Sequence, residues 1–193
     1  NDMNIFVLHE DPIEAAQMMC DKHIPKMIVE SAQMMASALR RHGATDKHMP
    51  IAKTTGRPYK GGYHDHPCTV WCGDTQMNFL WLAEHGQELS RQYTARFTDW
   101  ELLKVAPINE PKVHGCTQAI EHMKRYSFMI PKGSLTPFAR AFNKKKYPFL
   151  YDENIFTAVE AYRAYYSLDK HFAKWDKGTP APEWWVKIQE ENV

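Results

Sequence analysis

Several common features of protein sequences are scarce or missing in this chain of 193 residues. No apolar run approaches the ~18 residues that cross a membrane, and the start lacks a basic segment followed by an apolar stretch. The sequence therefore predicts neither membrane insertion nor secretion. An excess of one charge is also missing, because 24 Lys and Arg are balanced by 23 Asp and Glu. A nucleic-acid partner would have to bind through local clusters of basic residues.

Cysteine is sparse, and its four positions are Cys20, Cys68, Cys72 and Cys116. Because this is not the density of a disulfide scaffold, we expect reduced thiols in a cytoplasmic protein, in the host-cell cytoplasm if a phage encodes it. The stretches "YHDHPCTVWC" and "HGC" contain the atoms that bind zinc, but C-x3-C is not the usual C-x2-C pair. We predict no metal and no cofactor, with Cys68 and Cys72 as small core residues of one helix.

Internal repeats and paired strand-like runs are also absent, whereas helix signals recur. The "DPIE" stretch at 11–14 combines an N-cap, a proline at the first helical position and a capping-box glutamate, which predicts a helix to about Lys22. Pro25 favours a break at 21–24, because proline fits the first turn of a helix and not its interior. A second helix is then expected to run to about His42.

Two more long helices are expected, one at 74–97 capped by Asp74 and one at 153–175 capped by Asp152. The connections between them are rich in proline and glycine. The predicted fold class is therefore all-α and predominantly helical, a single domain over 1–193 with a short extended segment at 4–8, a long loop at 43–65 and an aromatic, basic tail at 176–193.

The stretch "CDKHIPKMIVES" at 20–31 crowds charged residues around the predicted helix break, namely Asp21, Lys22, His23, Lys26 and Glu30. A carboxylate beside a lysine can act as a general base, and a partly desolvated amine can attack an electrophilic carbon. These five residues are candidate catalytic groups. The alternative is a solvated helix face on which Lys26 and Glu30 form an i,i+4 pair.

Two further candidates, His64 and His66, stand in the "YHDHP" stretch before a helix start. In one interpretation both face a pocket, where they donate to phosphate or act as acid and base. In the other, His66 caps the following helix. The sequence leaves both interpretations open.

Aromatic and basic residues alternate near the C-terminus and recur elsewhere. Aromatic faces stack on unpaired bases while lysine and arginine bind the backbone, a combination that suits nucleic acid. The alternative is that the aromatic residues form core and the lysines its wet rim. The candidate nucleic-acid-binding residues are Arg57, Lys60, Trp71, Arg163, Lys170, His171, Lys174, Trp184 and Trp185.

An acid at a helix break before a basic helix, a loop ending in "HP" before an aromatic-bearing helix, and a late helix with "PEWW" form one combined pattern. It resembles the pyrimidine-dimer DNA glycosylase superfamily, typified by the phage enzyme called endonuclease V, and uncharacterised phage and bacterial proteins grouped near it. Residues 4–40 and 63–97 carry most of the resemblance. It implies an all-α protein that grips duplex DNA, extrudes a base and breaks the glycosidic bond through an imine, with an amine as nucleophile and a glutamate assisting.

By this resemblance, Asp21 lies near the place of the family's acid, Lys22 and Lys26 near its basic neighbours, and Trp184 and Trp185 near its aromatic tail. The family's nucleophile is an N-terminal α-amine, whereas Met3 is followed here by Asn4. Either Lys22 or Lys26 replaces that amine, or the protein performs another reaction on a base.

The sequence as a whole predicts a helical enzyme that acts on a nucleobase of duplex or single-stranded DNA, as a glycosylase, a lyase or a base-modifying enzyme. Two alternatives belong to other classes. One is a non-catalytic nucleic-acid-binding protein, and the other is a zinc-stabilised helical protein that serves in interactions.

Overall fold

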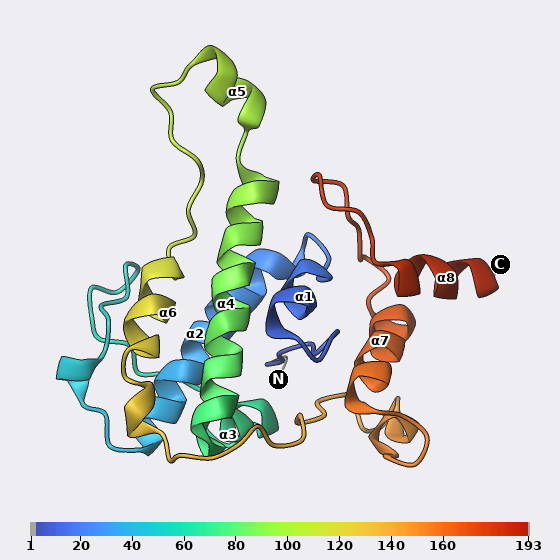
Figure 1. Cartoon of the computed structure of the whole chain (residues 1–193), viewed down its shortest axis with the longest axis horizontal. Helices are drawn as coiled ribbons and strands as arrows, with labels where there is room; N and C mark the ends of the chain where they lie inside the picture. Colours follow the sequence, from blue (N-terminus) through green and yellow to red (C-terminus); the bar gives the residue numbers. More distant parts are fainter. Residues whose placement is uncertain (1–2, 193) are drawn as a thin grey trace.

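The computed structural model describes residues 3–192, and positions 1, 2 and 193 of the predicted domain lie outside this description. The described residues form eight α-helices, three short 3-10 helices and no β-strand (Figure 1). Their one isolated β-bridge joins Ile51 to Pro58. The predominantly helical class predicted from the sequence is confirmed. None of the helices over 3–192 has the length and apolar character needed to cross a membrane.

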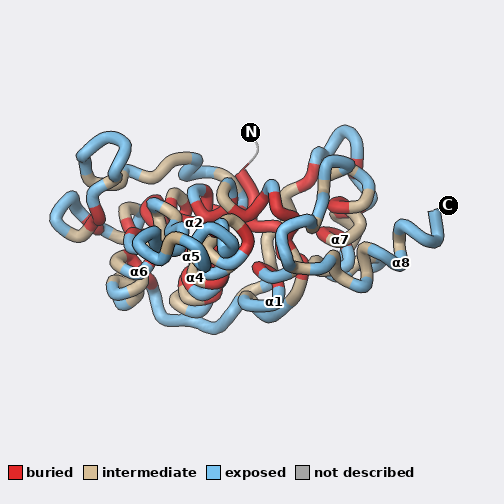
Figure 2. The backbone as a smooth tube through the Cα atoms, turned by 90° about the horizontal axis from the view of Figure 1, so that it is seen from above, coloured by how far each residue is buried: buried red, intermediate tan, exposed pale blue. Residues whose placement is uncertain are grey.

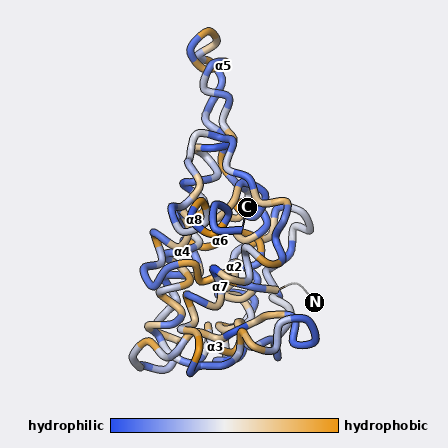
Figure 3. The backbone as a smooth tube through the Cα atoms, turned by 90° about the vertical axis from the view of Figure 1, so that its right-hand side faces the viewer, coloured by the Kyte–Doolittle hydropathy of each residue, from blue (hydrophilic) through white to orange (hydrophobic). Residues whose placement is uncertain are grey.

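In chain order the α-helices are α1 (Pro12–Gln17), α2 (His23–Arg41), α3 (Pro67–Asp74), α4 (Gln76–Phe97), α5 (Trp100–Val105), α6 (Thr117–Lys124), α7 (Ala158–Asp169) and α8 (Glu183–Glu191). The 3-10 helices are η1 (Asp46–His48), η2 (Ser127–Met129) and η3 (Pro148–Tyr151). The longest helix, α4, stands at the centre of the molecule. A narrow projection extends beyond the end of α4, and α5 lies at its tip (Figures 1 and 3). Helices α7 and α8 lie on the opposite side from α6 (Figure 1).

Helix α2 is the buried centre of the fold. Thirteen of its 19 residues are buried, as expected for a helix covered on nearly all sides. Helices α1, α3 and α6 pack around α2 and α4. The N-terminal segment at 3–8 is also buried, whereas α8 is exposed at the edge of the molecule (Figure 2). The exposed residues of α2 are Lys26, Val29 and Arg41.

The helix break around Pro25 was predicted, but its bounds differ. Asp11 caps α1 by accepting from the backbone N–H of Ile13 and Glu14, as expected. The helix ends at Gln17 and not near Lys22, because the Arg96 guanidinium donates to the backbone carbonyls of Gln17 and Met19. These carbonyls therefore need no helical partner.

Two other predicted caps are wrong. Asp74 ends α3, and the cap of α4 is Thr75, whose hydroxyl accepts from Asn78 N. Helix α7 begins after Thr157, which forms a capping box with Glu160, and not after Asp152. A turn at 153–155 occupies the chain between these positions, and α7 ends at Asp169, so the last predicted helix is shorter at both ends.

The long loop at 43–65 is fastened to α2. Ser37 Oγ donates to Gly62 O at 2.9 Å and accepts from Gly62 N at 2.8 Å, while Arg40 donates to Tyr59 O at 2.7 Å. Gly61 has a φ of +78°, and a Cβ there would lie 2.7 Å from Ser37 N, so only glycine fits this close approach. The loop therefore has a defined position against the helix.

Candidate active site

A cavity of about 850 Å³ opens where the N-terminal segment, the start of α2 and the end of α7 meet. Lys22, His23 and Lys26 reach it from α2, and His66 reaches it from the start of α3. The structure therefore brings together members of both charged clusters that the sequence indicated. Residues 140–144, Tyr151 and the 165–172 stretch close the other side.

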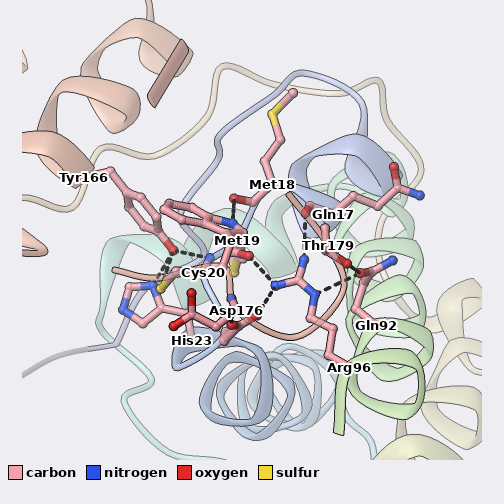
Figure 4. Close-up of polar contacts among 12 residues, drawn as sticks. Gln17, Met18, Met19, Cys20, His23, Gln92, Arg96, Tyr166, Asp176 and Thr179 are labelled. Atoms are coloured by element: carbon pink, nitrogen blue, oxygen red, sulfur yellow. Dashed lines mark hydrogen bonds and ion pairs between the residues drawn. The ribbon is translucent and has the colours of Figure 1, made fainter. Parts of the chain in front are cut away.

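A buried tyrosine, Tyr166, forms a hydrogen bond with His23. Its Nδ1 lies 2.6 Å from the hydroxyl of Tyr166, which also accepts from Cys20 N at 3.2 Å (Figure 4). Burial raises the pKa of Tyr166 well above its usual value, so the phenol keeps its proton. The hydroxyl also lies 3.4 Å from Cys20 Sγ, but sulfur is a weak acceptor, so the phenol O–H donates to His23 Nδ1 at the much shorter distance. The proton of the imidazole is then on Nε2.

Burial, followed by the charges of Lys170, Lys26 and Lys22, lowers the pKa of His23 to about 3. His23 is therefore neutral at physiological pH, and its Nε2–H is a hydrogen-bond donor. His66 has the same tautomer, because its Nδ1 accepts from Cys68 N at 3.1 Å. Burial also lowers the pKa of His66. Two neutral imidazole donors thus belong to one cavity.

The wall of the cavity is aromatic and locally strained. Phe6 adopts a φ of 56°, in the left-handed region that bulky residues rarely occupy. Its ring stacks on His23, with 4.5 Å between centroids. Tyr165, Phe142 and Phe172 line the same space. Strain of this kind persists only where surrounding contacts enforce it, and it is concentrated at functional sites.

The cations of the cavity outnumber its acids. Lys22 lies 4.6 Å above the ring of Phe172, and Lys144 lies 5.5 Å from that of Tyr151. Lys170 is paired with Asp169, the one carboxylate among the described lining residues. The remaining positive charge favours an anionic ligand.

Glu30 does not line the cavity but contacts two residues that do. Its Oε1 accepts from the backbone N–H of Asn4 at 2.8 Å, and its Oε2 is 4.0 Å from Lys26 Nζ. Its side chain is 10% exposed. Glu30 thus links the N-terminal segment to the lysine that faces the cavity.

Asp21 does not line the cavity. It is buried and forms an ion pair with Arg96, at 3.1 Å between Oδ1 and Nη1, and its Oδ2 accepts from Asp176 N. The ion pair joins the α1–α2 turn to α4, and the hydrogen bond joins it to the segment before α8. His64 is exposed and likewise does not line the cavity.

The predicted nucleic-acid-binding residues separate into several groups. Lys170 lines the first cavity, while Arg57 and Lys60 line a second one. His171 and Lys174 are exposed. The remaining four make contacts within the protein: Trp71 stacks edge-on with Trp81, Arg163 donates to Leu8 O and lies over Trp184, and Trp184 and Trp185 pack on Tyr166.

Several lining residues were missed by the sequence reasoning. Phe6 had been placed in a plain extended segment. Tyr166, which lies outside the lining and orients His23, was not among the candidate residues either. The lysines of "FNKKKYP" gave a usable signal, since they put basic and aromatic residues at the position that supplies Lys144. No local pattern marks the strained φ of Phe6.

The thiols of α3 are core groups, as predicted. Cys68 and Cys72 are fully buried, and burial raises the pKa of Cys68 to about 12 and that of Cys72 further. Both thiols therefore stay protonated inside the core. Within residues 3–192 no group of three metal-ligating side chains comes together.

The low pKa of His23 predicts a pH-dependent stability. Above pH 6.5 the histidine is neutral in both the folded and unfolded states. Below pH 6.5 the histidine becomes protonated in the unfolded chain, whereas in the folded protein it stays neutral down to about pH 3. The free energy of unfolding therefore falls as the pH is lowered. Between pH 7 and pH 5 we expect the wild type to lose ~2 kcal/mol more than His23→Gln, measured by urea unfolding at each pH. Equal losses would contradict this assignment.

Comparison with protein families gives a match over the N-terminal half of the chain. The model of the pyrimidine dimer DNA glycosylase family matches residues 3–102, which include α1 to α4 and the loop at 43–65. The matched part contributes Phe6, His23, Lys26 and His66 to the cavity. No curated protein and no solved structure matches the chain.

Proposed function

The chain belongs to the pyrimidine dimer DNA glycosylase family, whose model covers more than half of its 193 residues. On this premise we propose that the cavity of about 850 Å³ holds the pyrimidine whose glycosidic bond the protein breaks. DNA glycosylase-like activity follows from the family. The observation that supports the location is the meeting of two neutral N–H donors, aromatic walls and unpaired positive charge in one space.

The chemistry of the cavity suits an extruded pyrimidine nucleotide. Its volume of about 850 Å³ lies within the ~300–1,000 Å³ of small-molecule sites. Rings such as Phe6 and Tyr165 provide faces on which a base stacks, and the Nε2–H groups of His23 and His66 match the carbonyl oxygens of a pyrimidine. Lys144 and Lys170 provide charge for the flanking phosphates.

The nucleophile in this proposal is the amine of Lys22 or Lys26. Its lone pair forms a bond to C1′ of the sugar while the bond from C1′ to the base breaks, and the departing base keeps that electron pair. The imidazole donors stabilise the negative charge that develops on the base oxygens. Loss of the amine proton and opening of the sugar ring, with O4′ taking up a proton, complete an imine. Glu30, 4.0 Å from Lys26, is the acceptor for the amine proton in this proposal.

A DNA duplex with one pyrimidine dimer tests the function directly. The purified protein is expected to break the glycosidic bond of one pyrimidine of the dimer and to leave an undamaged duplex of the same sequence intact, as read by chromatography and strand cleavage. This separation of the base from its sugar is called base release below, although the base stays joined to its partner in the dimer. Binding without base release from any DNA would favour the non-catalytic alternative. Stoichiometric zinc in elemental analysis would favour the zinc-stabilised alternative.

Removing the His23 donor gives a graded test of its role. We expect His23→Phe to keep the stacking on Phe6 and to lower turnover by ~10²-fold, because one hydrogen bond to developing charge is lost. His23→Gln retains an N–H and should lose less. Single-turnover rates on the dimer duplex measure both variants, and a smaller loss in His23→Phe than in His23→Gln would show that the ring, rather than its donor, is what matters.

A further inference from the structure

Helix α2 carries one exposed stripe along an otherwise buried surface. Lys22 at its N-cap, Lys26 and Val29 are exposed and Gln33 is half-buried, and these four recur every three or four residues. Pro25, in the first turn, is also half-buried. Val29 is 38% exposed, although apolar neighbours on the same helix are fully buried. These four residues are called the α2 stripe below.

The α2 stripe joins two cavities. Lys22 and Lys26 line the first one, and Val29 and Gln33 line a second cavity of about 550 Å³ beneath the loop at 52–61. From Lys26 to Gln33 the helix rises ~10 Å, which is about three steps of a DNA strand at ~3.4 Å each. A strand that leaves the first cavity along the stripe therefore reaches the second within a few nucleotides.

The second cavity has an apolar floor and a cationic rim. Val29, Pro58 and Tyr59 form much of the floor. The Tyr59 hydroxyl donates to Cys116 Sγ at 3.4 Å, and burial raises the pKa of Tyr59, so this floor is uncharged. The cations that line the cavity are Lys53, Arg57 and Lys60, and none of the described lining residues is a carboxylate. An apolar face next to an anion is the chemistry of a nucleotide.

The loop that carries these cations has a defined position against α2 before any ligand binds. Its backbone is bound to α2 through Ser37 and Arg40, and Gly61 allows the close contact. A ligand would thus meet a formed cavity, and little ordering entropy would be lost on binding.

We propose that the second cavity binds a flanking nucleotide of the same DNA strand whose pyrimidine occupies the first cavity, with Arg57 and Lys60 on its phosphate and the Val29–Tyr59 floor against its base. This inference rests on the proposed function, because the first cavity fixes where the strand begins. It assigns the α2 stripe as the path between the two.

The test uses single-stranded oligonucleotides of increasing length in fluorescence anisotropy at several salt concentrations. The wild type should gain affinity when the strand becomes long enough to span both cavities. The Arg57→Ala/Lys60→Ala variant should lose that gain, ~10-fold or more, and bind the shortest strands as the wild type does. Its log–log salt slope should fall by ~0.7 for each phosphate contact removed. Val29→Asp should lose the same gain through repulsion.

Lys104→Ala/Lys187→Ala is the matched control, since it removes the same charge from α5 and α8, neither of which lines the two cavities. It should keep the full gain with length. A gain that survives in Arg57→Ala/Lys60→Ala overturns the inference and leaves the proposed activity intact. Failure of the wild type to release a base overturns the proposed activity, while a length gain that depends on Arg57 and Lys60 still supports the second cavity.

Discussion

Replacing both Lys22 and Lys26 with alanine is expected to reduce base release ~10³-fold or more while leaving the fold intact. Both amines line the first cavity, and one of them is the nucleophile in the proposed mechanism. Removal of a covalent nucleophile leaves only the rate supplied by binding and by the remaining hydrogen-bond donors. Because both side chains are exposed, the free energy of unfolding should change by no more than ~1 kcal/mol.

Single-turnover kinetics on a dimer-containing duplex provide the measurement, at protein concentrations that saturate the DNA. The single variants Lys22→Ala and Lys26→Ala show which amine reacts. Lys104→Ala/Lys187→Ala again serves as control, because it changes the net charge equally and should retain activity. Full activity in the Lys22→Ala/Lys26→Ala variant would remove the lysine nucleophile from the account.

The second large effect is expected on stability. Asp21→Ala should lower the free energy of unfolding by ~3–5 kcal/mol, because it leaves the Arg96 guanidinium buried without its charge partner. The Arg96 side chain is 0% exposed, and the same carboxylate accepts from Asp176 N. Burial already lowers the pKa of Arg96, and removal of Asp21 would take away the opposing attraction.

Urea unfolding of Asp21→Ala measures this loss. Asp65→Ala is a suitable control, since Asp65 is exposed and should change stability by less than ~0.5 kcal/mol. If Asp21→Ala instead kept the stability of the wild type and lost only turnover, Asp21 would be a catalytic acid, as the sequence suggested. The two outcomes separate a role in holding the fold from a role in chemistry.

Local signals in the sequence predicted much of the N-terminal half. The cap at Asp11, the start of α2 near Pro25 and the restart at His66 depend on residues within one turn of each other, so a local pattern predicts them. The end of α1 at Gln17 depends on Arg96 and was not predicted. The predicted start of α7 was wrong because two cap residues stand close together in the sequence. Asp152 and Thr157 are both good caps, and only the reciprocal bond with Glu160 favours the second.

The site depends on contacts that no local pattern records. Asp21 looked catalytic because Arg96, its partner, lies 75 residues further along the chain. The tautomer of His23 is set by Tyr166, which is 143 residues away. Likewise, the wall contributed by residues 140–144 reaches the cavity only through tertiary packing. The sequence could therefore provide candidate residues, but their division between scaffold and cavity required the fold.

The most direct test of the central claim is to trap the intermediate and find its position. Wild-type protein, incubated with dimer-containing DNA and sodium borohydride, should form a covalent adduct, because borohydride reduces an imine to a stable amine. Mass spectrometry of the digested adduct should place the DNA on Lys22 or Lys26, at the first cavity. An adduct on a peptide that does not line this cavity, or base release with no adduct, would contradict the account.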